Sequence, residues 1–191
     1  MKDEGLTVTI HLVSSLDGII AKTDNSVSWF DTPDHYEDGV TTSDSGEFLK
    51  SIDCYVMGST TYEHALALSR SYGWVYGDKP TIVVSKRRLA VERSNVEVYS
   101  GDLDALVNDR LRSSYKNVWV VGGAKLVSTF LRLKLADEIR LTILPIILGE
   151  GTKFIEHLKQ EQPLHLKDVT AYKSGMVELW YEVKKSLVLS P

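Results

Sequence analysis

Cysteine is almost absent from this sequence. Cys54 is the one cysteine among 191 residues, which excludes a disulfide framework and a zinc site built on cysteine thiolates. It lies in the apolar run from Ile52 to Met57, where no helix start or basic neighbour would lower the pKa of its thiol. We therefore expect Cys54 to be a small buried hydrophobic residue rather than a reactive thiol.

Long hydrophobic runs are missing too. Residues 1–5 hold no apolar stretch of the signal-peptide type. The longest apolar segment, Ile139 to Leu148, contains Arg140 and Pro145 and is far shorter than the ~20 residues that a membrane-spanning helix needs. These absences predict a soluble protein of a reducing compartment, and we expect that compartment to be the cytoplasm.

An excess of positive charge is absent as well. The sequence has 22 lysine and arginine residues against 26 aspartate and glutamate residues, a formal net charge of −4. Such a chain is a poor candidate for binding nucleic acid, although one basic cluster is enough to hold a small anion. The composition, 43% hydrophobic and 25% charged, excludes disordered and fibrous proteins. The length fits one domain, residues 1–185, followed by a tail, residues 186–191.

Several catalytic motifs do not occur. The sequence has no His-Glu-x-x-His, no Gly-x-x-x-x-Gly-Lys-Ser/Thr loop, no Gly-x-Ser-x-Gly elbow and no Gly-x-Gly-x-x-Gly after a strand. Its five histidines are scattered: His11, His35, His64, His157 and His165. We therefore expect no metal site, and hydrolysis by a nucleophilic serine or by a metal is disfavoured.

Hydrophobic patterns predict strands and helices in alternation over the first part of the chain. Polar and apolar residues alternate from Leu6 to Val13, which is typical of a strand. Short apolar runs suit strands that are covered on both faces, as in a parallel sheet, and three occur: Asp53–Met57, Thr81–Val84 and Val118–Val121. Helical patterns lie between or beside them: a short helix that begins near Asp44, Thr61–Ser69, Leu103–Arg112 and Lys125–Leu133.

The last part of the chain has a different pattern. Three longer strands are predicted, Glu138–Leu148, Leu164–Tyr172 and Met176–Val183, and residues 173–175 between the last two are typical of a hairpin turn. Together the elements predict an α/β fold in three layers. We expect a mixed, mostly parallel sheet with helices on both faces and a carboxyl-terminal antiparallel hairpin.

One irregular stretch, Asp24–Ser43, interrupts this regular pattern. It contains Trp29, Phe30, His35 and Tyr36. A loop of about 20 residues inside a compact domain is uncommon and usually functional. A surface loop without a function remains the alternative.

Three predicted junctions at strand ends share residues suited to phosphate. The first carries Gly58, Ser59, Thr60 and Thr61, the second Gly122, Gly123 and Ala124, and the third Ser85, Lys86, Arg87 and Arg88. Glycine lets a ligand approach the backbone, helix-start amides and hydroxyls bind phosphate, and arginine can fork onto a ribose 2′-phosphate. Each junction also has an ordinary explanation, with glycines in turns, Ser59 or Thr60 as a helix cap, and solvated cations. Because ligands of open α/β sheets bind at the carboxyl ends of strands, the three together indicate a nucleotide-like ligand with an extra phosphate.

Four motifs in a fixed order make the sequence similar to a known family. They are Ser15–Gly18, Val56–Glu63, Val121–Ala124, and Asp137–Ile139 leading to Leu144–Gly151. With them, the chain from Leu6 to Val183 resembles the dihydrofolate-reductase-like superfamily. It specifically resembles the reductase domain of riboflavin biosynthesis, the carboxyl-terminal half of the bifunctional deaminase-reductase. The resemblance implies a dihydrofolate-reductase-like fold, NADPH as cofactor, and hydride transfer to a heterocycle or its attached sugar, as in 5-amino-6-(5-phosphoribosylamino)uracil.

The resemblance also implies roles for particular residues. Gly122 and Gly123 would form a cis peptide against the cofactor, Gly58, Thr60 and Thr61 would meet the pyrophosphate, and Ser85, Lys86 and Arg87 would meet the 2′-phosphate. Ile20 and Ala21 would line the nicotinamide, and Ala124 and Leu126 would belong to the cofactor site after the glycine pair. Trp29 falls where the substrate loop of the family closes. Asp17 is a candidate substrate-binding residue, with a structural role as an acceptor of backbone amides as the alternative.

Two carboxylates are candidates for the proton donor. By the resemblance, Asp44 and Glu47 begin the helix that offers an acidic residue to the substrate in dihydrofolate reductases. Glu47 is the first choice, because an apolar cleft beside Phe48 would raise the pKa of its carboxyl. The same spacing is that of a helix-capping box, which remains the alternative.

Some positions depart from the family pattern. Ile19 stands where the riboflavin reductases usually have lysine, and Ser59 and Thr60 replace two cations. A dihydrofolate or pterin reductase, or a non-catalytic nucleotide-binding protein of the same fold, therefore stays open as an alternative. For the assembly we expect a homodimer, which is common among relatives, with the apolar strand Ile143–Leu148 as the contact if it lies near a sheet edge.

Overall fold

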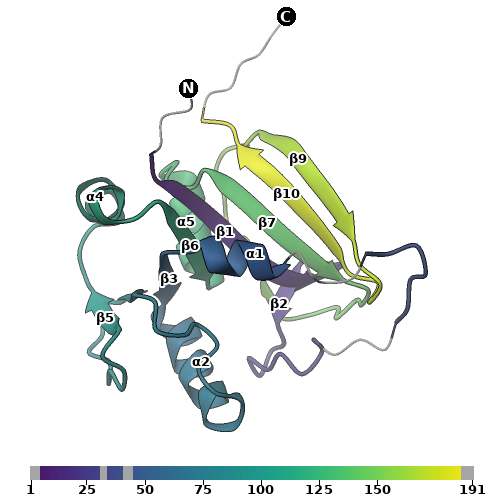
Figure 1. Ribbon diagram of the computed structural model, residues 1–191, viewed down its shortest axis with the longest axis horizontal. Helices are drawn as coiled ribbons and strands as arrows, with labels where there is room; N and C mark the ends of the chain where they lie inside the picture. Colours follow the sequence, from purple (N-terminus) through teal and green to yellow (C-terminus); the bar gives the residue numbers. More distant parts are fainter. Residues whose placement is uncertain (1–4, 31–33, 41–44, 186–191) are drawn as a thin grey trace, which may run out of the picture.

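An eight-stranded mixed sheet forms the centre of the computed structural model, which describes residues 5–30, 34–40 and 45–185 (Figure 1). The strand order is β5-β4-β3-β6-β1-β7-β10-β9. The six strands from β5 to β7 are parallel, β10 is antiparallel to β7, and β9 is antiparallel to β10. Their bounds are β1 Thr7–Ser15, β3 Cys54–Gly58, β4 Thr81–Val84, β5 Val96–Tyr99, β6 Asn117–Gly122, β7 Glu138–Leu144, β9 Leu164–Ala171 and β10 Val177–Val183. The predicted sheet with its antiparallel hairpin is confirmed.

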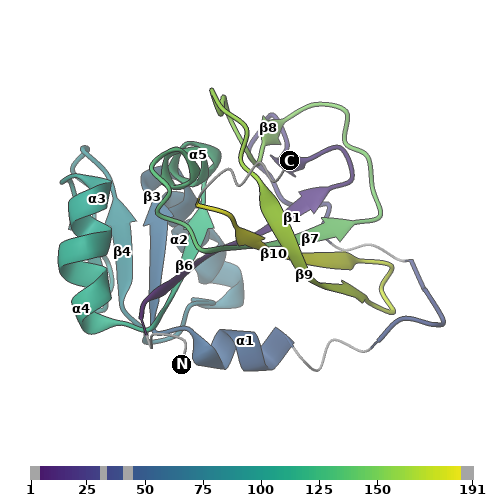
Figure 2. The same cartoon turned by 90° about the horizontal axis from the view of Figure 1, so that it is seen from above.

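Helices cover both faces of this sheet, as predicted (Figure 2). They are α1 Ser45–Ser51, α2 Ser59–Tyr72, α3 Leu103–Ala105, η2 Leu106–Leu111, α4 Arg112–Ser114 and α5 Ala124–Arg132. On one face, Phe48 of α1 and Tyr62 of α2 pack in an apolar cluster with Met57. On the other face, Leu106 and Phe130 pack in the larger core. The two layers of helices leave the carboxyl ends of the parallel strands between them.

Strand β1 shows why the predicted alternation matters. Val8, Ile10 and Leu12 point into the larger core, with exposed fractions of 1%, 0% and 7%. The alternate residues therefore face the layer of α1, and the ring of His11 contacts the ring of Phe48 with centroids 5.2 Å apart. A histidine is thus held in the middle of the sheet under α1.

Several elements differ from the sequence prediction. The helix predicted for 103–112 is a continuous helical segment of residues 103–114 whose middle part, η2, is a π-helix. β7 ends at Leu144 instead of Leu148, because Pro145 has no N–H to donate to the ladder. β7 also lies between β1 and β10, so its expected position near an edge was wrong. Strand β5 and the small sheet of β2 (Ile19–Ala21) and β8 (Thr152–Lys153) were not predicted.

Cys54 is fully buried in β3, as the sequence predicted. Burial raises the pKa of its thiol to about 12, so the thiolate does not form at neutral pH. Among the described residues, no helix combines the length and the apolar composition that crossing a membrane requires.

Candidate active site

The first two glycine junctions meet at the carboxyl ends of β3 and β6. Met57 is in register with Gly122, so both strands end at the same level. A β-carbon built on Gly58 would lie 3.7 Å from the carbonyl oxygen of Gly122 and from the amide nitrogen of Gly123. A β-carbon on Gly123 would lie 3.5 Å from Oγ1 of Thr61. The structure thus brings together residues that the sequence places more than sixty positions apart.

Helices α2 and α5 both begin at this junction, and each begins at a glycine. Gly58 is the N-cap of α2 and Gly123 the N-cap of α5, and neither cap provides a side-chain hydrogen bond to its first turn. The alternative that Ser59 or Thr60 is the N-cap is therefore wrong. The first amides of both helices and the positive ends of their dipoles face the same edge of the sheet, which suits an anion such as a pyrophosphate.

The glycine pair itself has the conformation that the resemblance implies. The peptide bond between Gly122 and Gly123 is cis. Gly122 has φ +121°, and a β-carbon there would lie 3.3 Å from Cδ2 of Leu12, so this position requires glycine. Ala124 and Leu126, which follow on α5, are buried, and Leu126 belongs to the larger core. These two residues would therefore meet a ligand only through their backbone.

The third junction lies beside the first two. Val84 at the end of β4 is in register with Gly58, and Ser85 follows it. The Oγ of Ser85 accepts a hydrogen bond from the amide of Arg87 at 3.0 Å, which turns the chain at this point. The guanidinium of Arg87 donates to Oε2 of Glu63 on α2 at 2.9 Å, and both side chains are exposed.

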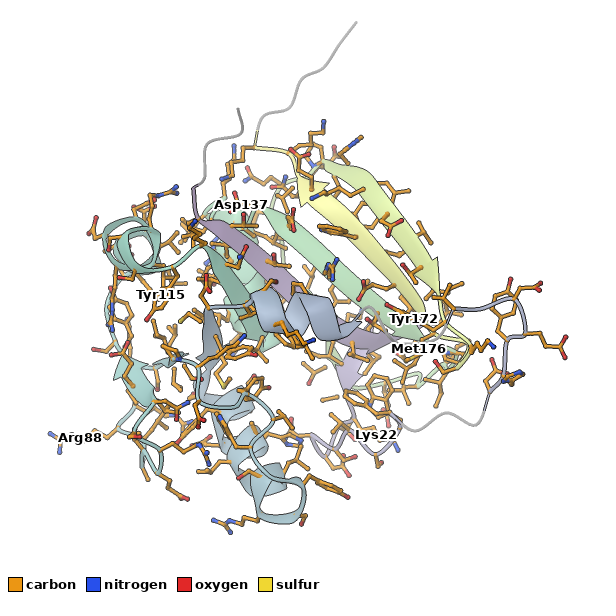
Figure 3. The ribbon with its side chains drawn as sticks, in the orientation of Figure 1. Lys22, Arg88, Tyr115, Asp137, Tyr172 and Met176 are labelled. Carbon is orange, nitrogen blue, oxygen red and sulfur yellow. The ribbon has the colours of Figure 1, made fainter. Side chains whose placement is uncertain are left out.

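The remaining cations of this junction point into solvent. Lys86 and Arg88 are exposed, and Figure 3 shows Arg88 extending away from the body of the protein, far from Lys22. The junction therefore offers exposed positive charge next to Ser85, which is itself buried.

Asp17 joins two loops at the same edge of the sheet. Its Oδ1 accepts hydrogen bonds from Oγ of Ser15 at 2.6 Å and from the amide of Leu148 at 3.1 Å, and its Oδ2 accepts one from the amide of Gly149 at 2.7 Å. The hydrogen bond from Ser15, with those from the two amides, lowers the pKa of the Asp17 carboxyl to about 2. This geometry favours the alternative in which Asp17 accepts backbone amides.

The residues expected to line the nicotinamide lie directly after this turn. Ile20 and Ala21 belong to β2, which pairs with β8. The amide of Phe154, beyond β8, donates to the carbonyl oxygen of Gly18 at 3.1 Å. The pairing of β2 with β8 and the hydrogen bonds to the Asp17 carboxylate therefore hold the start of β2 against the loop after β7.

The long irregular stretch is held at two places. Trp29 is only 4% exposed and contacts Phe30 edge to face, with ring centroids 4.7 Å apart. Further along, the amide of Tyr36 donates to the carbonyl of Lys173 at 2.7 Å, and the amide of Lys173 donates to the carbonyl of Val40 at 2.9 Å. Figure 3 marks Tyr172 and Met176, which lie at the hairpin end of β9 and β10 where these bonds form. The loop is thus tied to the carboxyl-terminal hairpin.

Of the two expected proton donors, only Glu47 lies within the described residues. Glu47 lies at the beginning of α1, while Asp44 lies outside the described residues. Helix α1 is held over the sheet by Phe48, whose ring contacts His11 and Trp119. In the described part of the chain, no group of three or more His, Cys, Asp or Glu side chains could hold a metal ion.

Sequence reasoning missed a set of polar side chains under α1. His11, Arg140, Thr142 and Glu178 come from β1, β7 and β10 and lie on the same face of the sheet. Only the polar half of the alternating pattern in β1 pointed to His11, and nothing in the sequence pointed to its neighbours. We call these four residues the polar cluster.

The chain matches one family model, that of the RibD C-terminal domain, over residues 6–177. It is 29% identical over 172 residues to the uncharacterised protein YwjB of Bacillus subtilis, covering 90% of this chain and 95% of YwjB. It is 30% identical over 131 residues to the 2,5-diamino-6-ribosylamino-4(3H)-pyrimidinone 5′-phosphate reductase of Aquifex aeolicus, covering 56% of each chain.

Two solved structures with the same fold each match most of this chain. One, named as a putative riboflavin biosynthesis protein, is from Shewanella sp. PV-4, with TM-score 0.79, 23% identity and coverage of 94% of this chain and 100% of that one. The other is the diaminohydroxyphosphoribosylaminopyrimidine deaminase/5-amino-6-(5-phosphoribosylamino)uracil reductase of Thermotoga maritima, with TM-score 0.67 and 15% identity. The match covers 95% of this chain and 57% of the Thermotoga chain.

Proposed function

Because the chain belongs to the RibD C-terminal domain family, we propose that it is an NADPH-dependent reductase whose substrate is a ribosylated aminopyrimidine or a closely related heterocycle. The names of the Aquifex and Thermotoga relatives support the substrate class. The observation that carries the proposal is the meeting of two uncapped helix starts at one glycine pair. Such an arrangement suits the pyrophosphate of a dinucleotide.

The residues present fit a dinucleotide at this place. A β-carbon on Gly58 or on Gly123 would make only ordinary van der Waals contacts, the nearest at 3.7 Å and 3.5 Å, so neither of these half-buried glycines is packed tightly against the protein. Thr60 and Thr61 add hydroxyls at the start of α2. In this proposal Gly58, Gly123 and these hydroxyls hold the pyrophosphate, and Ile20 and Ala21 contact the nicotinamide.

The preference for NADPH over NADH rests on the third junction. Ser85, Lys86 and Arg87 follow the end of β4, next to Gly58. A ribose 2′-phosphate there would add an anion that competes with Glu63 for the guanidinium of Arg87, which already forms a charge-assisted hydrogen bond. Lys86, which is exposed, would add a second cation.

The reaction in this proposal is a reduction with one hydride and one proton. When bound, NADPH supplies the hydride. The protein aligns the substrate, excludes water with the loop of Trp29 and Phe30, and donates a proton to the nitrogen or oxygen that gains charge. We assign that proton to Glu47 at the start of α1, with Asp44 as the second choice.

An unbiased oxidation screen tests the proposed function. NADPH and NADH are each mixed with the protein and with ribosylated aminopyrimidines, pterins or folates, and absorbance at the nicotinamide band is followed. We expect NADPH oxidation with a ribosylated aminopyrimidine. Oxidation with pterins or folates alone would support the dihydrofolate or pterin alternative, and tight NADPH binding without any oxidation would support a non-catalytic nucleotide-binding protein.

We also propose that the protein is a homodimer, joined through an apolar surface on β9 and β10. Leu164, Leu166 and Val169 on the edge strand β9 are 42%, 48% and 50% exposed. Leu179 pairs with Val169, and Tyr181 pairs with Leu166, so all five side chains share one face of the sheet. Exposed apolar side chains on an edge strand suit contact with a second copy of the chain.

A further inference from the structure

The polar cluster lies level with the glycine pair. A β-carbon built on Gly122 would lie next to Leu12 of β1. His11 and Val13, the neighbours of Leu12 in that strand, are therefore at the same height along the sheet as the glycine pair. His11 is in register with Arg140, and Val13 is in register with Thr142. Glu178 of β10 stands opposite Thr142. The cluster therefore begins at the carboxyl-terminal edge where the cofactor is proposed to bind, and it continues across the sheet under α1.

The members of the cluster approach one another without forming direct hydrogen bonds between their charged groups. Nε2 of His11 lies 3.6 Å from Oε2 of Glu178, and an Nη atom of Arg140 lies 3.7 Å from Oε1. Both nitrogens of His11 and Nε of Arg140 are buried and have no hydrogen-bond partner within the described residues. Buried polar atoms are almost always paired with protein, water or a ligand. This concentration of unpaired atoms marks a place where a ligand or ordered water completes the hydrogen bonding.

The electrostatics of the cluster select against an anion. Burial and the nearby guanidinium of Arg140 lower the pKa of His11 to about 4, so its imidazole is neutral near pH 7. Burial raises the pKa of Glu178, while Arg140 and a hydrogen bond from Thr142 oppose this shift. One cation and one anion then balance, and the carboxylate of Glu178 repels phosphate. The next charged pair, Lys167 and Glu138, is also balanced, with 2.5 Å between Nζ and Oε1.

Aromatic rings give the cluster flat walls. The guanidinium carbon of Arg140 lies 4.4 Å from the ring centroid of Phe48 and 4.1 Å from that of Trp180. The ring of His11 lies between Phe48, at 5.2 Å, and Trp119, at 4.9 Å. Planar groups stacked in this way are held rigidly, so the hydrogen-bonding edges of Arg140 and His11 keep a fixed direction.

We infer that the polar cluster binds the ring of a neutral, planar heterocycle by its hydrogen-bonding edge. Glu178 accepts from ring or amino N–H groups, and Arg140, which lies between Phe48 and Trp180, donates to a ring carbonyl. An aminopyrimidinone has this edge. The inference rests on the proposed reductase function and extends it, because it assigns the ring to the cluster under α1 and leaves any sugar phosphate to other residues.

Binding of isolated substrate fragments tests this inference. Two probes are used, 5,6-diaminouracil for the ring and ribose 5-phosphate for the phosphate end, each titrated by calorimetry with and without NADPH. The variant Glu178→Gln keeps the size of the side chain and removes its charge. We expect it to weaken 5,6-diaminouracil binding at least tenfold, with NADPH and ribose 5-phosphate affinities unchanged. Glu182→Gln, an exposed change on the same strand, is the matched control and should bind all three as the wild type does.

The other outcomes overturn the inference. Equal 5,6-diaminouracil affinities for wild type and Glu178→Gln, or no binding of this probe by the folded wild type, show that the cluster is only structural. A tighter ribose 5-phosphate complex in Glu178→Gln places the phosphate there instead. If Glu178→Gln does not fold, Arg140→Lys, which keeps the charge and loses the planar fork, replaces it with the same expected loss of ring binding. NADPH titration of the wild type is separate, so failure of the reductase proposal is distinguishable from failure of the ring site.

Discussion

Arg87 and Glu63 are joined by a hydrogen bond of 2.9 Å from Nη2 to Oε2, across the gap between the loop after β4 and helix α2. The pair is exposed, so its direct contribution to stability is small. Its importance lies in holding the guanidinium against Glu63 near the start of α2, the helix whose first turn is proposed to bind phosphate. A bound 2′-phosphate would therefore compete with the carboxylate of Glu63 for the guanidinium of Arg87.

Removal of that guanidinium should weaken the binding of NADPH. Arg87→Ala is expected to lower NADPH affinity by about one to two decades, roughly 1.5–3 kcal/mol, because a charge-assisted hydrogen bond to a doubly charged phosphate is lost. NADH affinity should not change. Glu63→Gln is the matched variant and should raise NADPH affinity, since it frees the guanidinium. Calorimetric titrations measure the NADPH and NADH affinities of the wild type and both variants. Equal NADPH and NADH affinities in the wild type would contradict the assignment of Arg87 to the 2′-phosphate.

Gly123→Ala should abolish cofactor binding while the protein stays folded. The backbone of Gly123, with φ −75°, is open to alanine, and the added β-carbon would meet only Oγ1 of Thr61 at 3.5 Å. A bound pyrophosphate would collide with it. Gly122→Ala is the contrast, because its φ of +121° strains any side chain and should lower the melting temperature. Thermal melts and NADPH titrations separate the two effects; retained NADPH binding in a folded Gly123→Ala protein shows that the pair is only a turn.

A proton donor at the start of α1 should be visible in the pH dependence of turnover. Glu47→Gln is expected to lower turnover by about 10²-fold with NADPH binding intact. A general acid must be protonated, so the wild-type rate falls as pH rises through its pKa, and this basic limb should disappear in the variant. Asp44→Asn is the paired experiment. If only Asp44→Asn loses turnover, the two roles are exchanged, and if both variants stay active, water supplies the proton.

Protonation of His11 should destabilise the fold at acidic pH. Its pKa is about 4 in the folded protein against 6.5 ordinarily, so between these values the unfolded chain binds more protons and stability falls as pH falls. The full difference is on the order of 3 kcal/mol, reached near pH 4. The raised pKa of Glu178 acts in the opposite direction, through proton uptake by the folded state. Urea unfolding between pH 4 and pH 7 measures the slope, which His11→Gln should reduce; an unchanged slope contradicts a buried neutral histidine.

The proposed dimer should depend on the apolar face of β9. Leu166→Lys combined with Val169→Lys is expected to convert a dimer into a monomer of 21.4 kDa, because two charges would be buried at the contact. His165→Lys changes an exposed neighbour on the opposite face of the strand and should leave the dimer intact. Sedimentation equilibrium of the three proteins gives the masses. A wild type that is monomeric at micromolar concentration excludes this contact.

Much of the fold could be predicted from local pattern. The apolar runs that became β3, β4 and β6 are short and continuous because both of their faces are covered by helices. Gly58 and Gly122–Gly123 indicated the carboxyl-terminal edge because each follows a predicted buried strand, and because several such junctions occur together. Strand β5 could not be predicted, since the four residues of Val96–Tyr99 are too few to establish a periodic pattern.

The polar cluster could not be predicted for a different reason. His11, Arg140 and Glu178 lie on three strands that are far apart in the sequence, and their meeting depends on the register between β1, β7 and β10. Taken within its own strand, each of these residues is only a polar position in an alternating pattern, which predicts a partly exposed side chain. Only tertiary packing under Phe48 and Trp119 buries these side chains and gives them their chemistry.

The hydrogen bonds between residues 36–40 and the hairpin of β9 and β10 have a consequence for engineering. The loop that begins after β2 and the strand that carries Glu178 are attached to each other through Lys173. Because these are main-chain hydrogen bonds, a grafted loop or hairpin whose backbone follows a different path would lose them and release the loop. The two segments are therefore best exchanged between members of this family as one unit, which keeps the hydrogen bonds between them.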